Sequence, residues 1–238
     1  MHVRQGLKAR RLAALLLGLS MTAACAKNAP QETVPPAEAA AGEVEPSARA
    51  GRAKIVFLGD SLTAGYGLEP GEAFPSLLQQ RLRETGLDAE VVNAGVSGDT
   101  SAGGLRRVDW SLDADVRILV VALGGNDALR GLSTEELQRN LAAIIERARR
   151  RHVTVILAGM EAPPNLGNAY TSAFRRVYKD LAEQYGLTLV PFLLDGVAGN
   201  ASFNQADGIH PNTAGARKVA ELVWPYLERA LRQAGRGD

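Results

Sequence analysis

The sequence from residue 54 onward alternates two hydrophobic patterns. Short runs of apolar, often β-branched residues predict five strands, at 54–58, 89–92, 116–123, 153–158 and 188–192. Several of these runs are apolar throughout, which is typical of strands buried on both faces of a sheet. Longer segments with helical periodicity separate them. This alternation predicts a single α/β domain in which helices cover a parallel sheet.

The longer segments place their apolar residues at helical spacing. The most regular one follows Ser133, which with Glu136 matches a capping box, and its apolar face holds Leu137, Leu141, Ile144, Ile145 and Ala148. Further helices are predicted at 72–85, 168–185 and 213–233. Pro225 predicts a bend in the last of these, because proline has no N–H to donate within a helix.

The N-terminal segment 1–25 has the layout of an export signal. Four basic residues precede an apolar run at 12–24, which ends at Cys25, the only cysteine. The run is shorter than the roughly 20 residues that a membrane-spanning helix needs, so we expect a signal peptide and an exported, periplasmic or outer-membrane-anchored protein. Small residues before Cys25 resemble a lipoprotein signal and predict a lipid anchor there, although Thr22 stands where such signals usually carry leucine. Ordinary cleavage after Ala26 is the alternative.

Composition changes again after the signal. Residues 26–52 hold four of the eleven prolines together with many Ala and Glu, and this mixture predicts a linker without a packed core. A domain at 53–233 and a short tail at 234–238 complete the chain. The net charge of +1 and an aromatic content of 5% give no basis for a nucleic-acid partner. We expect a monomer.

Polar residues and glycines follow four of the five strands. Ligands bind in open parallel sheets beyond the carboxyl ends of the strands. The segments that reach this edge are Gly59-Asp60-Ser61-Leu62-Thr63, Asn93-Ala94-Gly95, Gly124-Gly125-Asn126-Asp127 and Asp207-Gly208-Ile209-His210-Pro211. The sequence therefore predicts a site to which each of these segments contributes.

The residue types in these segments match nucleophilic catalysis. A serine hydroxyl needs an imidazole to remove its proton, and the imidazole needs an acceptor that fixes its tautomer. Of the three histidines, only His210 belongs to this edge; His2 lies in the signal and His152 precedes the fourth strand. We therefore expect Ser61 as nucleophile, His210 as base and Asp207 as the orienting acid. Asp60 is the competing acid, but we expect its side chain to point elsewhere.

Acyl transfer also needs donors aimed at the developing oxyanion, each worth on the order of 3 kcal/mol. Gly95 can offer a backbone N–H, Asn126 a side-chain amide, and Ser61 its own backbone N–H. The predicted chemistry needs no metal ion and no organic cofactor.

The four segments together resemble the four motif blocks of the SGNH superfamily, also called GDSL hydrolases. The similarity extends over essentially all of 53–233 and looks closest to the bacterial thioesterase I, lysophospholipase and arylesterase group, through Ser97-Gly98-Asp99-Thr100, the run 124–131 and the run 207–212. The resemblance implies a flavodoxin-like, three-layer fold with strand order 2-1-3-4-5 and an oxyanion hole from Ser61, Gly95 and Asn126. It also implies that residues 160–165 help to shape an acyl pocket.

The sequence thus predicts a serine hydrolase that cleaves small carboxylic esters or thioesters through an acyl-enzyme. An α/β-hydrolase is disfavoured because the chain has no G-x-S-x-G elbow. A nucleotide-binding module is disfavoured because Gly65-Tyr66-Gly67 is not a complete G-x-G-x-x-G. A carbohydrate O-deacetylase and a non-catalytic exported binding lipoprotein remain as alternatives.

Overall fold

The computed structural model describes residues 52–234. The predicted signal 1–25, the linker up to residue 51 and the tail from 235 lie outside the described residues. Five strands form one parallel sheet in the order β2-β1-β3-β4-β5, which confirms the predicted order. They are β1 (Ala53–Gly59), β2 (Ala89–Gly95), β3 (Val116–Ala122), β4 (Thr154–Ala158) and β5 (Thr188–Val190).

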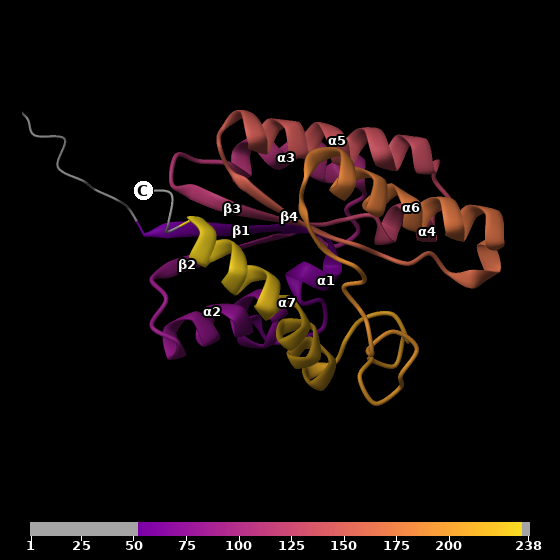
Figure 1. Cartoon of the computed structure of the whole chain (residues 1–238). Helices are drawn as coiled ribbons and strands as arrows, with labels where there is room; N and C mark the ends of the chain where they lie inside the picture. Colours follow the sequence, from indigo (N-terminus) through magenta and orange to yellow (C-terminus); the bar gives the residue numbers. More distant parts are fainter. Residues whose placement is uncertain (1–51, 235–238) are drawn as a thin grey trace, which may run out of the picture. The chain divides into compact units, whose positions relative to one another are not determined.

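Helices cover both faces of this sheet, which confirms the three-layer α/β fold (Figure 1). The α-helices are α1 (Ser61–Ala64), α2 (Phe74–Glu84), α3 (Ser101–Ser111), α4 (Gly125–Leu129), α5 (Thr134–Arg150), α6 (Asn168–Tyr185) and α7 (Thr213–Ala234). Two 3₁₀ turns, η1 (Pro70–Glu72) and η2 (Pro164–Leu166), complete the elements. On one face α5 packs against α3 and α6, and on the other α2 packs against α7.

The helix α3 has no counterpart among the predicted elements. Its first turns contain Gly103 and Gly104, and glycine disfavours an isolated helix by about 1 kcal/mol per residue relative to alanine. Tertiary contacts explain both glycines. A Cβ on Gly103 would overlap the Asp99 carboxylate, and one on Gly104 would overlap Leu123. The two glycines weaken the helical signal in the sequence. They also allow α3 to approach the edge of the sheet.

Other element boundaries shift for local reasons. The predicted helix at 72–85 is split, because Ala73 is extended with ψ of 139° and α2 begins only at Phe74. Pro191 has no N–H for a sheet partner, and β5 ends before it. Ser133 accepts a hydrogen bond from the Glu136 N–H at 3.2 Å, and its hydroxyl donates to Glu135. The reciprocal bond from the Ser133 N–H to the Glu136 side chain is not formed, so the capping box is only half formed. The helix α7 continues through Pro225.

The centre of the sheet is the most buried part of the described domain. Residues 55–58 of β1 and 118–121 of β3 are almost completely excluded from solvent. Their register places Gly59 opposite Gly95 on one side and Ala122 on the other. The ends of three adjacent strands are therefore held level with one another, immediately before the segments that carry the predicted site residues. Within residues 52–234, no helix is both long and apolar enough to cross a membrane.

Candidate active site

Ser61 lies where β1 turns into α1. The strand ends at Gly59, Asp60 caps the helix by accepting the Leu62 N–H on Oδ1 at 3.0 Å, and Ser61 is the first helical residue. A Cβ on Gly59 would overlap the Thr63 side chain, so only glycine permits so tight a passage from strand to helix. The turn places the serine at the carboxyl edge of the sheet.

The structure brings Ser61, His210 and Asp207 together. The Ser61 Oγ lies 2.9 Å from His210 Nε2, and His210 Nδ1 lies 2.6 Å from Asp207 Oδ2. These distances are those of direct hydrogen bonds, although Ser61 and His210 are 149 positions apart in the sequence. The arrangement is the one that a serine nucleophile, an imidazole base and an orienting carboxylate require.

Asp207 is also bonded to the backbone of its own loop. Its Oδ1 accepts the N–H groups of Ile209 at 2.9 Å and of His210 at 3.0 Å. The hydrogen bond from His210, aided by these two N–H donors, lowers the pKa of Asp207 to about 2. The carboxylate is therefore ionised at neutral pH and can stabilise an imidazolium.

A second set of contacts, from Tyr66 and Gln205, also holds His210. The Tyr66 ring packs on the imidazole with 4.7 Å between centroids. The Gln205 backbone N–H donates to the His210 carbonyl at 2.7 Å, and the Gln205 side-chain amide donates to the Tyr66 carbonyl at 2.6 Å. The loop after Ser61 and the loop that carries His210 are thus tied to each other.

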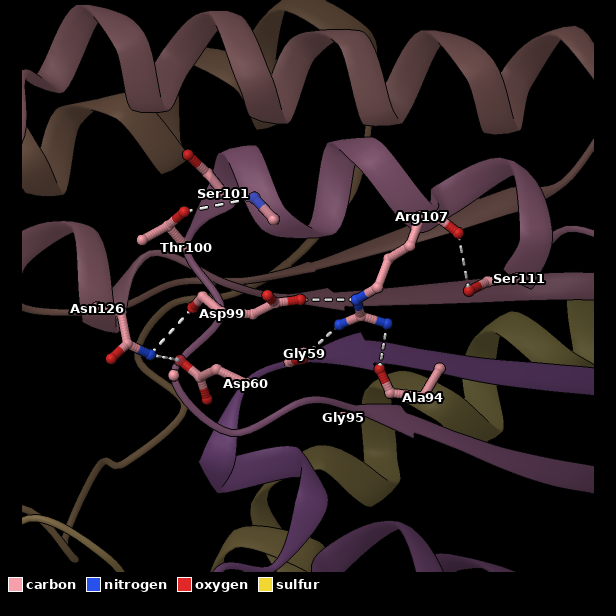
Figure 2. A network of polar contacts seen from close by, with 12 residues as sticks. Gly59, Asp60, Ala94, Gly95, Asp99, Thr100, Ser101, Arg107, Ser111 and Asn126 are labelled. Atoms are coloured by element: carbon pink, nitrogen blue, oxygen red, sulfur yellow. Dashed lines mark hydrogen bonds and ion pairs between the residues drawn. The ribbon is translucent and has the colours of Figure 1, made fainter.

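Asn126 lies in the first turn of α4, shortly after the end of β3. Its Nδ2 donates to the Asp99 carbonyl at 3.0 Å and lies 3.4 Å from Asp60 Oδ2 (Figure 2). The next residue, Asp127, accepts the N–H and the hydroxyl of Ser101 at 2.8 and 2.5 Å. Asn126 is therefore anchored to the loop before α3 through its amide, and to the first residue of α3 through its neighbour.

Gly95 does not present a free donor. Its N–H donates to Asn93 Oδ1 at 3.0 Å, and a Cβ at this position would overlap the Ala64 backbone. The geometry thus gives Gly95 a packing role against α1 and does not support the predicted oxyanion role.

Gly98 offers a further backbone N–H at this edge, which the sequence alone does not single out as a donor. Its φ is +83°, and within residues 52–234 its N–H has no hydrogen-bond partner. It directly precedes Asp99, whose carbonyl holds Asn126. The signal was present in the run Ser97-Gly98-Asp99, where a polar loop needs a glycine for a left-handed turn.

Asp60 bonds to Leu62 and Asn126 rather than to the imidazole, so it is not the acid that orients His210. It is only 3% exposed. Burial raises the pKa of Asp60 to about 6, against the lowering effect of the Leu62 N–H. The sequence provided no sign that this carboxyl group would be so deeply buried.

A cleft of about 500 Å³ opens beside these groups. Ser61, Asn126 and His210 contribute its polar wall, while the rest is mainly apolar, with Leu62, Met160, Ala162, Pro163, Phe192 and Leu194 among its lining residues. Leu129 and Ile209 also line the cleft and are about half exposed, at 54% and 47%. Among residues 52–234, no cluster of His, Cys, Asp or Glu side chains is arranged to hold a metal ion.

The amino-acid sequence is similar to those of known proteins. Residues 57–218 match the GDSL-like lipase/acylhydrolase family. The chain is 46% identical over 178 residues to esterase TesA of Pseudomonas aeruginosa, covering 74% of this chain and 89% of that protein. It is 36% identical over 175 residues to thioesterase 1/protease 1/lysophospholipase L1 of Escherichia coli K12, covering 73% of this chain and 83% of that protein.

Solved structures agree with these matches. The crystal structure of TesA superimposes with a TM-score of 0.72 at 45% identity, covering 74% of this chain and 99% of that one. A psychrotrophic esterase EstA from Pseudoalteromonas, inhibited by monoethylphosphonate, superimposes with a TM-score of 0.72 at 30% identity and covers 75% of this chain and 98% of its own.

Proposed function

We propose a mechanism and a substrate class from the premise that this chain belongs to the GDSL-like lipase/acylhydrolase family and is an esterase of that family. In this mechanism Ser61 attacks the acyl carbonyl while His210 Nε2 accepts the hydroxyl proton. The imidazolium then donates that proton to the departing alcohol or thiol. Water hydrolyses the resulting acyl-enzyme with His210 again as base, and Asp207 holds the imidazole throughout.

The observation that carries this proposal is the unbroken chain of hydrogen bonds from Ser61 Oγ to His210 and on to Asp207. The oxyanion donors in the proposal are the Ser61 N–H, the Asn126 amide and the Gly98 N–H. Asn126 Nδ2 carries two hydrogens, so it would keep its bond to the Asp99 carbonyl and exchange only Asp60 Oδ2 for the substrate oxyanion. Such donors stabilise charge that develops only in the transition state.

Active-site labelling tests the nucleophile. A fluorophosphonate probe should attach to Ser61 of the full chain, as peptide mass spectrometry would locate it, and Ser61→Ala and His210→Ala should abolish the labelling. Ser76→Ala is a suitable control, because the hydroxyl of that serine donates to the Pro70 carbonyl and does not contact an imidazole. A chain that binds esters without reacting with the probe would instead be the non-catalytic binding lipoprotein.

The substrate class we propose is an ester or thioester with an apolar acyl chain. Its support is the cleft, whose lining is mainly apolar and whose half-exposed residues Leu129 and Ile209 extend the apolar surface outward. A sugar acetate would leave most of this surface unused. Rates on p-nitrophenyl esters of increasing chain length, compared with rates on sugar acetates, test this choice against a carbohydrate O-deacetylase.

We propose that the protein is exported and carries a lipid on Cys25. The support is the sequence alone: basic residues, an apolar run, and small residues directly before the single cysteine. Mass spectrometry of the mature N-terminus from the native host distinguishes the outcomes. A diacylglyceryl-modified Cys25 at the first position supports the anchor, whereas an unmodified terminus after Ala26 contradicts it.

A further inference from the structure

Arg107 lies on α3 and does not line the cleft, yet its guanidinium bonds to three segments at the edge of the sheet. Its Nη2 donates to the Gly59 carbonyl at 2.7 Å, its Nη1 to the Ala94 carbonyl at 2.6 Å, and its Nε to Asp99 Oδ2 at 2.6 Å (Figure 2). The first two acceptors belong to the ends of β1 and β2, and the third follows β2 in the loop before α3. One side chain thus links all three.

These contacts are well shielded from solvent. The side chains of Arg107 and Asp99 are 23% and 16% exposed, so their ion pair is screened less than a surface pair. The planar guanidinium satisfies carbonyl and carboxylate acceptors in fixed directions. Gly103 makes the approach feasible, since a Cβ there would overlap the Asp99 carboxylate.

The same loop holds the amide of Asn126. Arg107 fixes the side chain of Asp99, and the backbone carbonyl of Asp99 accepts Asn126 Nδ2 at 3.0 Å. A shift of Asp99 would therefore change the direction of the amide. Arg107 also fixes the Gly59 carbonyl, and Gly59 directly precedes Asp60, the second acceptor near Asn126 Nδ2.

We propose that Arg107 is a positioning residue, which sets the orientation of the oxyanion-binding amide of Asn126 through Asp99. The inference rests on the proposed function, in which Asn126 stabilises the oxyanion. Small displacements of groups that bind the transition state can cost about 100-fold in rate. Arg107 would therefore affect turnover without touching the substrate.

The primary variants are Arg107→Lys and Asp99→Asn. Lysine keeps the charge but cannot donate in three fixed directions, and asparagine keeps the backbone carbonyl while removing the ion pair. Arg147→Lys is the matched control. Arg147 likewise bonds a carbonyl, that of Leu105, and a carboxylate, that of Asp109, but it joins α5 to α3 away from the cleft.

Steady-state rates on a p-nitrophenyl ester should separate a positioning role from a merely structural one. We expect kcat to fall about 10- to 100-fold in both primary variants, with KM and the acid limb of the pH profile unchanged. Arg147→Lys should stay within about twofold of wild type. In an Asn126→Ala background, Arg107→Lys should cause little further loss, because the group that it positions is already absent.

Two results would overturn the inference: wild-type kcat in folded Arg107→Lys or Asp99→Asn, or losses that multiply fully in the Asn126→Ala background. Thermal melting of each variant establishes folding, and Asp99→Asn decides the question if Arg107→Lys does not fold. A wild-type chain that neither hydrolyses esters nor reacts with the fluorophosphonate would instead contradict the proposed function itself.

Discussion

Asp207 contacts His210 through both of its carboxylate oxygens. Oδ2 lies 2.6 Å from the imidazole Nδ1, and Oδ1 accepts the backbone N–H of the same residue at 3.0 Å. One carboxylate thus sets both the conformation of the loop and the direction of the ring. Because the two functions use different oxygens, they can be separated by mutation.

Asp207→Asn should impair catalysis while leaving the loop folded. An asparagine Oδ1 can still accept the backbone N–H, but its amide faces Nδ1 as a donor and favours the wrong tautomer of His210. In a serine triad this change lowers kcat on the order of 10⁴-fold, and we expect a loss of about 10³- to 10⁴-fold here, measured on a p-nitrophenyl ester.

Asp195→Asn is the control for this prediction, since Asp195 is exposed in the segment that leads from β5 to the same loop. It should retain wild-type kcat. An Asp207→Asn variant with normal turnover and a normal melting temperature would remove Asp207 from the triad.

Asn126→Ala should lower kcat by about 10²- to 10³-fold, because it removes one oxyanion donor. Asn140→Ala is the matched comparison. Asn140 donates its amide to Ser101 Oγ at 2.9 Å, close to the same loop but outside the cleft. Circular dichroism and kcat for both variants check the prediction, which fails if the two lose activity equally.

Asp60 should make the stability of the domain depend on pH. Its pKa is raised to about 6 in the folded state, so the folded protein binds this proton more tightly than the unfolded chain does. The contribution of Asp60 to stability is therefore most favourable below about pH 4 and declines as the pH rises through 6. The size of this decline is about 3 kcal/mol.

Asp60→Asn should abolish that decline. We expect the free energy of unfolding of the variant, relative to wild type, to rise by up to about 3 kcal/mol between pH 4 and pH 8, as measured by urea titration. Asp88→Asn, at an exposed ion pair with Arg52, is the control. Its difference from wild type in the free energy of unfolding should be the same at pH 4 and at pH 8. A constant difference for Asp60→Asn as well would show that the carboxyl group does not titrate in this range.

The half-exposed cleft residues should determine the preference for long acyl chains. Ile209→Ser and Leu129→Ser remove apolar contact that only a longer chain reaches, and a buried methylene contributes about 0.8 kcal/mol. We expect KM for decanoyl esters to rise about 3- to 10-fold, with acetyl esters unaffected. Val96→Ser is the control, because Val96 is 46% exposed but does not line the cleft. Equal effects on all chain lengths would place the acyl chain elsewhere.

Much of the fold could be predicted because its signals are local. Apolar runs mark β1 and β3, helical spacing marks α5, and a polar or glycine-rich segment follows each strand that leads to the site. The rule that ligands bind beyond the carboxyl ends of parallel strands then groups Ser61, Asn126 and His210 before any coordinates are known.

Tertiary contacts decided the rest. Glycines in α3 oppose a helix locally and are explained only by the close approach of Asp99 and Leu123. In the sequence Gly95 and Gly98 look equally able to donate an N–H, whereas in the folded chain the Gly95 N–H is bonded to the Asn93 side chain. The burial of Asp60 and the three acceptors of Arg107 likewise have no local signature. The hydrophobic periodicity of a sequence indicates which face of a helix or strand is apolar. Hydrogen-bond partners and burial depend on segments that meet only in the folded chain.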